Sequence, residues 1–288
     1  MSLQDVWQLS FNFFYGKAVC AEPVEEDLSS DAGLLVLRQF DEQQGLTAGF
    51  AEQLHDPRCC PTHTTLQMVR SRVFGILAGY EDQNDHDTLR SDAVFKLLAD
   101  RLPEDDDLAS QPTLSRFENS ITPHSLLNLG DWFITRFVDS FVEPPREITL
   151  DLDVFDDPTH GQQQLTFYHG FYEQYQYLVR AITCAENDLL VLPVLLFGTA
   201  DPALGVVQDL ERVVTRLREK FPGVLIRVRA DSGFARPFLY EACERLNVDY
   251  SIGLGMNPVL KRHSDELLQM AVEMHETTGQ SQRLFTGF

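Results

Sequence analysis

The segment that most constrains the fold is residues 148–164, ITLDLDVFDDPTHGQQQ, because it combines strand periodicity with a dense group of acids. Apolar and polar side chains alternate over residues 148–154, which predicts a strand with one apolar face, and Asp151 and Asp153 share the other face. The run DDPTHG at residues 156–161 is typical of a turn, so the strand should end among carboxylates. Like charges this close need a proton or a metal ion among them, which makes the segment a candidate metal site. A solvated acidic turn is the alternative.

Length and composition predict a globular protein. The 288 residues are 43% hydrophobic, enough for one large domain or two ordinary ones. The longest apolar run is far shorter than the roughly 20 residues that a membrane span needs, and the first residues lack the pattern of a signal peptide. Five scattered cysteines favour reduced thiols over a disulfide framework. We therefore expect a soluble, cytoplasmic protein with no membrane partner.

The net charge argues against non-specific nucleic-acid binding. At −21, the chain should be repelled by a polyanion unless its basic residues cluster locally. The charge is a total over the whole chain, so it does not exclude a local DNA-binding surface.

Helical periodicity dominates the first half of the chain. Helices are predicted over residues 32–43, 47–54, 65–79, 92–102 and 125–141, and a Pro-Pro pair at 144–145 ends the last of them. We expect residues 1–146 to form a mostly helical domain and residues 147–288 a second domain.

Residues 92–119 resemble a helix-turn-helix. Ser110 can cap a helix whose first turn contains Pro112. This helix would present four polar side chains to DNA phosphates or base edges: Thr113, Ser115, Arg116 and Asn119. An ordinary capped helix explains the same residues, so DNA contact here is a hypothesis.

Strands and helices are mixed after residue 147. Strands over 177–184 and 189–197 suggest a hairpin; a helix over 205–221, a strand over 224–230, a helix over 236–246, a strand over 248–254 and a helix over 260–274 follow. This order predicts an α/β fold, a mixed sheet that has parallel neighbours and helices on its faces.

A second predicted strand also ends in acid, because Asp231 follows residues 224–230. If the two strands are neighbours, Asp153 faces Asp231, with Asp151 one step deeper, at the edge where open sheets form their sites. Oxygen ligands of this kind suit Mg²⁺ or Mn²⁺, with Asp156 at the rim of the site. The alternative is that Asp231 only caps the next helix.

Two arginines lie close to these acids in the sequence. Arg229 precedes Asp231 by two residues and Arg236 follows it by five. We expect both to hold a phosphate beside the metal site.

Five strings in this chain resemble the bacterial insertion-sequence transposases that carry a group 1 DDE domain. They are GYEDQNDHDTLRSD, LASQPTLSRFENS, DLDVFDDPTHGQQ, RADSGFA and CERLNVDYSIGL, in chain order. The resemblance implies an RNase H-like core that nicks transposon ends and joins them to target DNA. It also implies two Mg²⁺ or Mn²⁺ ions held by Asp, Asp and Glu, terminal inverted repeats and target DNA as partners, and a possible homodimer. By position, Asp153 corresponds to the first acid and Asp231 to the second, with Asp151 and Asp156 as alternatives for the first.

The chain departs from the family pattern in two places. Val154 and Phe155 stand where the family has a small residue and Thr, so the surroundings of the first acid are bulkier. The family's third acid belongs to a helix beyond a further segment, and Glu266, Glu273 and Glu276 lie too early to replace it. We therefore expect an incomplete core that is inactive as this chain alone.

Two other functions fit parts of the sequence. The DLDV string also resembles the start of haloacid-dehalogenase-like phosphohydrolases, in which Asp151 would be the nucleophile and Asp153 a general acid. That reading lacks the later acidic pair those enzymes need. The other possibility is a non-catalytic remnant that only binds DNA through its helical half.

Overall fold

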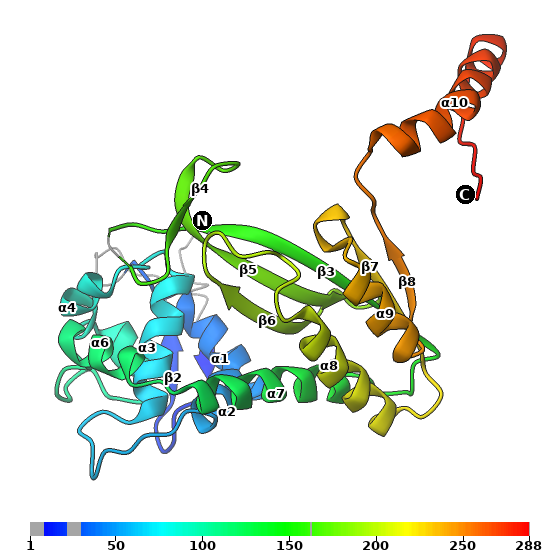
Figure 1. Ribbon diagram of the computed structural model, residues 1–288. Coiled ribbons are helices and arrows are strands. Elements are labelled where there is room, and N and C mark those ends of the chain that lie inside the picture. The colour runs from blue at the N-terminus through cyan, green and yellow to red at the C-terminus, as the bar shows by residue number, and fades with distance from the viewer. Residues whose placement is uncertain (1–8, 22–29, 162, 288) are drawn as a thin grey trace, which may run out of the picture. The chain divides into compact units, whose positions relative to one another are not determined.

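The computed structural model describes residues 9–21, 30–161 and 163–287, and the chain forms two compact units, Met1–Arg136 and Phe137–Phe288 (Figure 1). The units divide within the last turn of helix α7, whereas the predicted domain boundary lies in the loop after it. In the described residues no helix has the length and apolar character to cross a membrane.

The first unit is mostly helical. It contains a small hairpin and a series of helices: β1 (Leu9–Phe11), β2 (Val19–Ala21), α1 (Leu34–Gln44), α2 (Leu46–Glu52), α3 (Thr65–Leu77), the 3₁₀ turn η1 (Gln83–Asp85), α4 (His86–Leu89), α5 (Ala93–Leu98), α6 (Gln111–Asn119) and α7 (Pro123–Asp139). Helix α3 begins with a capping box, in which Thr64 and Gln67 satisfy each other's backbone N–H groups. The predicted helices are thus present, with small shifts at their ends.

Helix α5 is shorter than the sequence predicts. The expected helix over residues 92–102 ends at Leu98, because Asp100 takes a left-handed conformation with φ 59°. The backbone N–H of Arg101 then turns back to the carbonyl of Lys96 at 2.8 Å and closes the helix.

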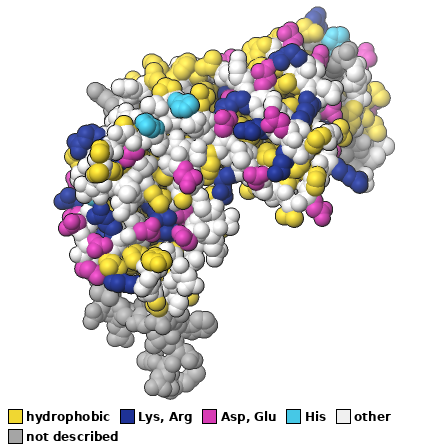
Figure 2. All heavy atoms as spheres, turned by 90° about the horizontal axis from the view of Figure 1, so that it is seen from below, with side chains coloured by type: hydrophobic (Ala, Val, Ile, Leu, Met, Phe, Trp, Pro, Cys, Tyr) yellow, Lys and Arg dark blue, Asp and Glu magenta, His cyan; other side chains and the backbone are white. Residues whose placement is uncertain are grey.

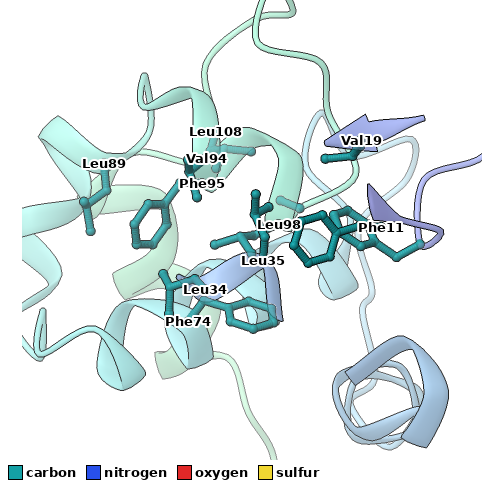
Figure 3. Packing of buried hydrophobic residues seen from close by; sticks show 12 residues of the cluster. Phe11, Val19, Leu34, Leu35, Phe74, Leu89, Val94, Phe95, Leu98 and Leu108 are labelled. Atoms are coloured by element: carbon teal, nitrogen blue, oxygen red, sulfur yellow. The ribbon is translucent and has the colours of Figure 1, made fainter. Parts of the chain in front are cut away.

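The core of the first unit brings the hairpin onto the helices (Figure 3). Phe11 and Val19 of the hairpin pack with Leu35 of α1 and Leu98 of α5. Beside this core, the guanidinium groups of Arg38 and Arg70 are almost fully buried and both bind the Asp100 carboxylate. Asp100 therefore needs its left-handed turn, since that turn places its carboxylate between two buried cations.

The second unit is built on a mixed sheet. It contains β3 (Glu147–Pro158), β4 (Phe167–His169), β5 (Gln174–Cys184), β6 (Leu190–Leu196), α8 (Val206–Lys220), β7 (Leu225–Ala230), the 3₁₀ turn η2 (Ser232–Phe234), α9 (Pro237–Arg245), β8 (Asp249–Ile252) and α10 (Pro258–Thr278). The order is β4-β5-β3-β7-β8, and β6 also pairs with β5. β3 is antiparallel to β5 and parallel to β7, so the prediction of a mixed α/β sheet with parallel neighbours is confirmed.

The two faces of the sheet differ. Ile148, Leu150, Ile226 and Val228 point to one face and are buried, and Figure 1 shows α8 and α9 packed on the sheet. α8 contributes five buried aliphatic residues, as expected for an amphipathic helix over a sheet. Residues of the other parity on β3 and β7, Asp151 and Arg229 among them, stay partly or largely exposed, except for the buried Thr149.

Strand β3 is longer than predicted. The sequence places a turn at residues 156–161, but β3 continues through Asp156 and Asp157 to Pro158, because β5 pairs with it over this whole length. The short strand β4, which pairs with the start of β5, was not predicted either. Tertiary pairing extends the strand into residues that favour turns in isolation.

Gly198, which follows β6, should be intolerant of any side chain. A Cβ atom there would lie 2.1 Å from the Gln176 carbonyl oxygen and 2.8 Å from that of Phe167. Gly198→Ala should lower the free energy of unfolding by about 1–3 kcal/mol or more, because backbone atoms cannot move aside easily. Urea unfolding measures this, with Gly170→Ala as the control, since a Cβ at Gly170 meets nothing within 4 Å. Equal stabilities of the two variants would contradict this packing.

Acid should destabilise the chain partly through His86. Burial, assisted by the nearby Arg72 guanidinium, lowers the pKa of His86 from 6.5 to about 4. The folded chain therefore binds the proton more weakly than the unfolded chain, so the contribution is complete above pH 6.5 and is lost as the pH falls toward 4. The loss amounts to at most about 3 kcal/mol.

The measurement is the free energy of unfolding between pH 7 and pH 4.5. His86→Gln should flatten the pH dependence, while His124→Gln, at an exposed position, should leave it as in the parent chain. A parent and a His86→Gln variant with the same slope would rule out this role for His86.

Candidate functional site

The candidate site lies where β3 and β7 reach the same edge of the sheet. Their parallel register pairs Asp151 with Arg229 and Leu152 with Ala230. Asp153 and Asp231 are the next residues on each strand, and both are exposed. The two acid-bearing strands are therefore neighbours, which was only a condition of the predicted site, and their backbones run about 5 Å apart here.

Asp231 is held by a local turn. Its Oδ1 accepts a hydrogen bond from the backbone N–H of Gly233 at 2.9 Å, which caps the 3₁₀ turn η2. Phe234, the last residue of this turn, is completely buried and anchors it. The alternative in which Asp231 caps the following helix is wrong in detail, because Arg236 occupies the N-cap of α9.

Asp153 shares its face of β3 with a large apolar side chain. Its Oδ1 accepts a hydrogen bond at 2.8 Å from the backbone N–H of Val154. Its partner across the antiparallel pair is Ala181, a small residue that leaves room over the strand. Phe155 is 52% exposed on the same face, so the large side chain that departs from the family pattern lies beside the Asp153 carboxylate.

Asp151 has a positive partner. Nε and Nη2 of Arg229 each donate a hydrogen bond of 2.6 Å to one of its two carboxylate oxygens. Hydrogen bonding and charge from Asp151 raise the pKa of Arg229. This bidentate pair engages both oxygens of Asp151. It also engages the guanidinium of Arg229, which was predicted from the sequence to hold a phosphate.

Asp156 points to the other face of the sheet. It lies an odd number of residues from Asp153 on a continuous strand, so their side chains diverge. Its carboxylate accepts a 2.6 Å hydrogen bond from Gln174, which also binds the Gln176 side chain at 3.0 Å. Of the four predicted metal ligands, Asp153 and Asp231 follow the last paired residues of β3 and β7, Asp151 is in an ion pair with Arg229 on the same face of β3 as Asp153, and Asp156 is on the opposite face.

The donor set at this edge fits a hard divalent cation in part. Mg²⁺ is commonly bound by one or two carboxylates plus substrate phosphates, and Asp153 and Asp231 provide two carboxylates on one face. Across the described residues, no three His, Cys, Asp or Glu side chains form a group that could hold a metal ion. Any further ligand of the ion would have to be a group other than the side chains of Asp153 and Asp231, such as a substrate phosphate.

Arg236 is tied to the loop before α8. Its Nε and Nη2 lie 3.2 and 3.1 Å from Oδ2 of Asp201, which belongs to the loop that joins β6 to α8. Both arginines that the sequence assigned to phosphate binding are thus paired with carboxylates of this chain.

The predicted DNA-facing residues lie together on α6 in the first unit. Arg116 and Asn119 are exposed, and Thr113 and Ser115 are half-buried. Arg116 donates a hydrogen bond to Thr113 at 3.3 Å, and Asn119 binds the carbonyl of Ser115 at 2.8 Å. Thr113 and Arg116 also line a pocket of about 160 Å³ with Arg58, whose guanidinium pairs with Asp56.

The surface charges are mixed in sign. Figure 2 shows Lys and Arg side chains lying among Asp and Glu side chains on the face that it draws. This distribution agrees with the net charge of −21. A DNA surface on this chain would therefore need close, specific contacts, because long-range attraction is weak.

Sequence reasoning missed Arg180. It lies between Leu178 and Ile182 in the buried parity of β5, and it is 1% exposed. An arginine in the buried parity of a strand signals an internal partner, because a buried charge is stable only when paired. That signal was available in the sequence.

The second unit is thus an α/β fold with a mixed sheet, and two carboxylates, Asp153 and Asp231, lie at one edge of that sheet. The model of the family described as transposase DDE domain group 1 matches residues 12–288. The chain therefore belongs to this transposase family, as the sequence motifs implied.

Solved structures of other transposases are similar to the chain only distantly. The piggyBac transposase synaptic complex with hairpin DNA has 15% identity and a TM-score of 0.38, over 77% of this chain and 48% of that chain. The Drosophila P element transposase strand transfer complex has 13% identity and a TM-score of 0.26, over 72% of this chain and 43% of that chain. The Mos1 transposase paired-end complex with left transposon end has 12% identity and a TM-score of 0.27, over 92% of this chain and 88% of that chain.

The chain spans about half the length of the first two of these structures. Likenesses this weak carry no argument about the site. A comparison with curated proteins found no match.

The ion pair between Asp151 and Arg229 should contribute little to stability, because the arginine is 54% exposed. A double-mutant cycle with Asp151→Asn and Arg229→Gln should give a small coupling free energy. The coupling should shrink in 1 M salt. A large coupling that does not change with salt would mean that the pair is buried in solution.

Proposed function

We propose that this chain is an insertion-sequence DDE transposase with an RNase H-like core that acts on DNA strands with the help of divalent metal. The observation that carries the proposal is the parallel pairing of β3 and β7, because Asp153 and Asp231 directly follow the last residues that the two strands pair. The membership of the DDE family supports it independently.

Asp153 and Asp231 act as the two metal-binding acids in this proposal. Asp153 and Asp231 would hold Mg²⁺ or Mn²⁺, which would supply activation of the attacking oxygen and stabilisation of the leaving phosphate oxygen, with two ions expected. The hydrogen bonds from Val154 and Gly233 orient the carboxylates and leave each of them one further oxygen for a ligand. Arg229 neutralises Asp151, which lowers the repulsion among the acids that share this face.

Asp153 is favoured as the first acid over both alternatives. Asp151 has both oxygens occupied by Arg229, and Asp156 faces the other side of the sheet, where Gln174 holds it. The same ion pair removes support for Asp151 as the nucleophile of a phosphohydrolase.

Two carboxylates do not complete a two-metal site. We therefore expect this chain alone to bind a divalent ion weakly and not to cut DNA. Glu266, Glu273 and Glu276 lie on α10, in which the described residues include no buried side chain. Helix α6, with Thr113, Ser115, Arg116 and Asn119, is the proposed contact to terminal-repeat DNA, and a homodimer remains a prediction.

Mn²⁺ binding tests the assignment of the acids. Electron paramagnetic resonance of free Mn²⁺ should show binding by the parent chain and a loss of affinity of about 10-fold or more in Asp153→Asn and in Asp231→Asn, because each removes a charged ligand. Asp156→Asn is the matched control and should bind like the parent. Loss of affinity in Asp156→Asn, with Asp153→Asn unaffected, would assign the first acid to Asp156 instead.

DNA binding separates the catalytic proposal from a remnant that only binds. In the proposed transposase, Arg116→Gln weakens binding of terminal-repeat DNA, and Asp153→Asn leaves that binding intact. Specific DNA binding by a chain that takes up no Mn²⁺ would favour the non-catalytic remnant.

A further inference from the structure

Arg180 is the one arginine of the described strands that is almost fully buried, and it reaches across to the loop between β6 and α8. Its Nη1 donates hydrogen bonds to the carbonyl oxygens of Pro202 at 2.9 Å and Leu204 at 2.5 Å. Its Nη2 binds the carboxylate of Asp209 on α8. One guanidinium therefore fixes two carbonyl groups of the loop and the first turn of α8.

The same loop supports the turn that carries Asp231. A Cβ on Gly233 would lie 3.7 Å from Cγ of Pro202, so the loop and η2 are packed in contact. Asp201, the residue before Pro202, is the carboxylate that holds Arg236 just after η2. The loop thus contacts η2 and Arg236, two residues past it, and Gly233 of η2 donates the hydrogen bond that orients Asp231.

On β5, Arg180 is next to the residue that pairs with the other acid. In the antiparallel pair of β3 and β5, Arg180 is opposite Val154 and Ala181 is opposite Asp153, so the Arg180 side chain points to the opposite face of the sheet from Asp153. The arginine therefore belongs to the strand that flanks Asp153, while its guanidinium holds the loop that flanks Asp231.

We propose that Arg180 is a positioning residue for the metal site: it fixes the β6–α8 loop against η2 and so holds the Asp231 carboxylate in register with Asp153. This inference rests on the proposed function, because it concerns the metal site assigned to those two acids. Arg180 touches neither acid, so its effect on them is transmitted through Pro202 and Gly233.

The test compares Arg180→Met with Arg70→Met. Both replace a buried guanidinium that pairs with a carboxylate, but Arg70 belongs to the ion network of the first unit. Mn²⁺ affinity is measured at a temperature where both variants are fully folded by circular dichroism. Arg180→Met should weaken Mn²⁺ binding by about 10-fold, the usual effect of losing an outer support of a metal ligand, and Arg70→Met should leave it unchanged.

A residue-specific signal reports on the carboxylate itself. The amide of Gly233, which donates to Asp231, should shift in the ¹⁵N–¹H spectrum of metal-free Arg180→Met and should lose its Mn²⁺-induced broadening. Arg180→Lys, which keeps the charge without the planar fork, should have an intermediate affinity.

Asp201→Asn keeps the inference testable if Arg180→Met does not fold. It alters an exposed carboxylate of the same loop and leaves no buried charge unpaired, and it should weaken Mn²⁺ binding by a few-fold. Unchanged Mn²⁺ affinity in Arg180→Met, or in Asp201→Asn where the former is unfolded, would overturn the positioning role while the metal site stands. A parent chain that does not bind Mn²⁺ at all would overturn the proposed site and the positioning role together.

Discussion

The parallel pairing of β3 with β7 is the interaction on which the rest of the second unit depends. Parallel neighbours need a crossover, which here runs through β5, β6 and α8, and this path buries one face of the sheet under helices. Because the pairing of the two strands stops at Leu152 and Ala230, the acids that follow these residues, far apart in sequence, become neighbours. The acids are on the exposed face, so the aliphatic core under α8 and α9 is built without burying their charges.

Buried arginines organise the contacts that apolar packing leaves unspecified. In the first unit, Arg38 and Arg70 share the carboxylate of Asp100 and thereby join α1 and α3 to the turn after α5. In the second, Arg180 joins β5 to the loop before α8 and to Asp209. Apolar contacts are non-directional, whereas the planar guanidinium group forms hydrogen bonds in only a few orientations. The buried arginines therefore hold in one conformation loops that apolar packing alone would allow to adopt several.

The four aspartates of β3 have four different surroundings within seven positions. Asp151 is neutralised by Arg229, Asp153 stays exposed, Asp156 is held by Gln174, and Asp157 continues the strand opposite Tyr177. These differences arise because successive residues of a strand point to opposite faces and because each aspartate has a different partner strand or side chain nearby. The acids that are close together in the sequence therefore lie on two opposite faces, with Asp156 on one and the other three on the other, and Asp151 is ion-paired.

The sequence alone was enough to predict most of the helices and strands, the mixed α/β class, the shared face of Asp151 and Asp153 and the transposase family, because periodicity and local motifs are properties of short segments. It was not enough to predict that β3 is the neighbour of β7, that β3 runs on to Pro158, that α5 stops at Leu98, or that Asp156 lies on the opposite face of a continuous strand. Those features depend on pairing with β5 and on a carboxylate shared by two distant arginines. The partnership of Asp151 with Arg229 and the reach of Arg180 were likewise decided only by tertiary structure, since both join residues that the chain keeps far apart.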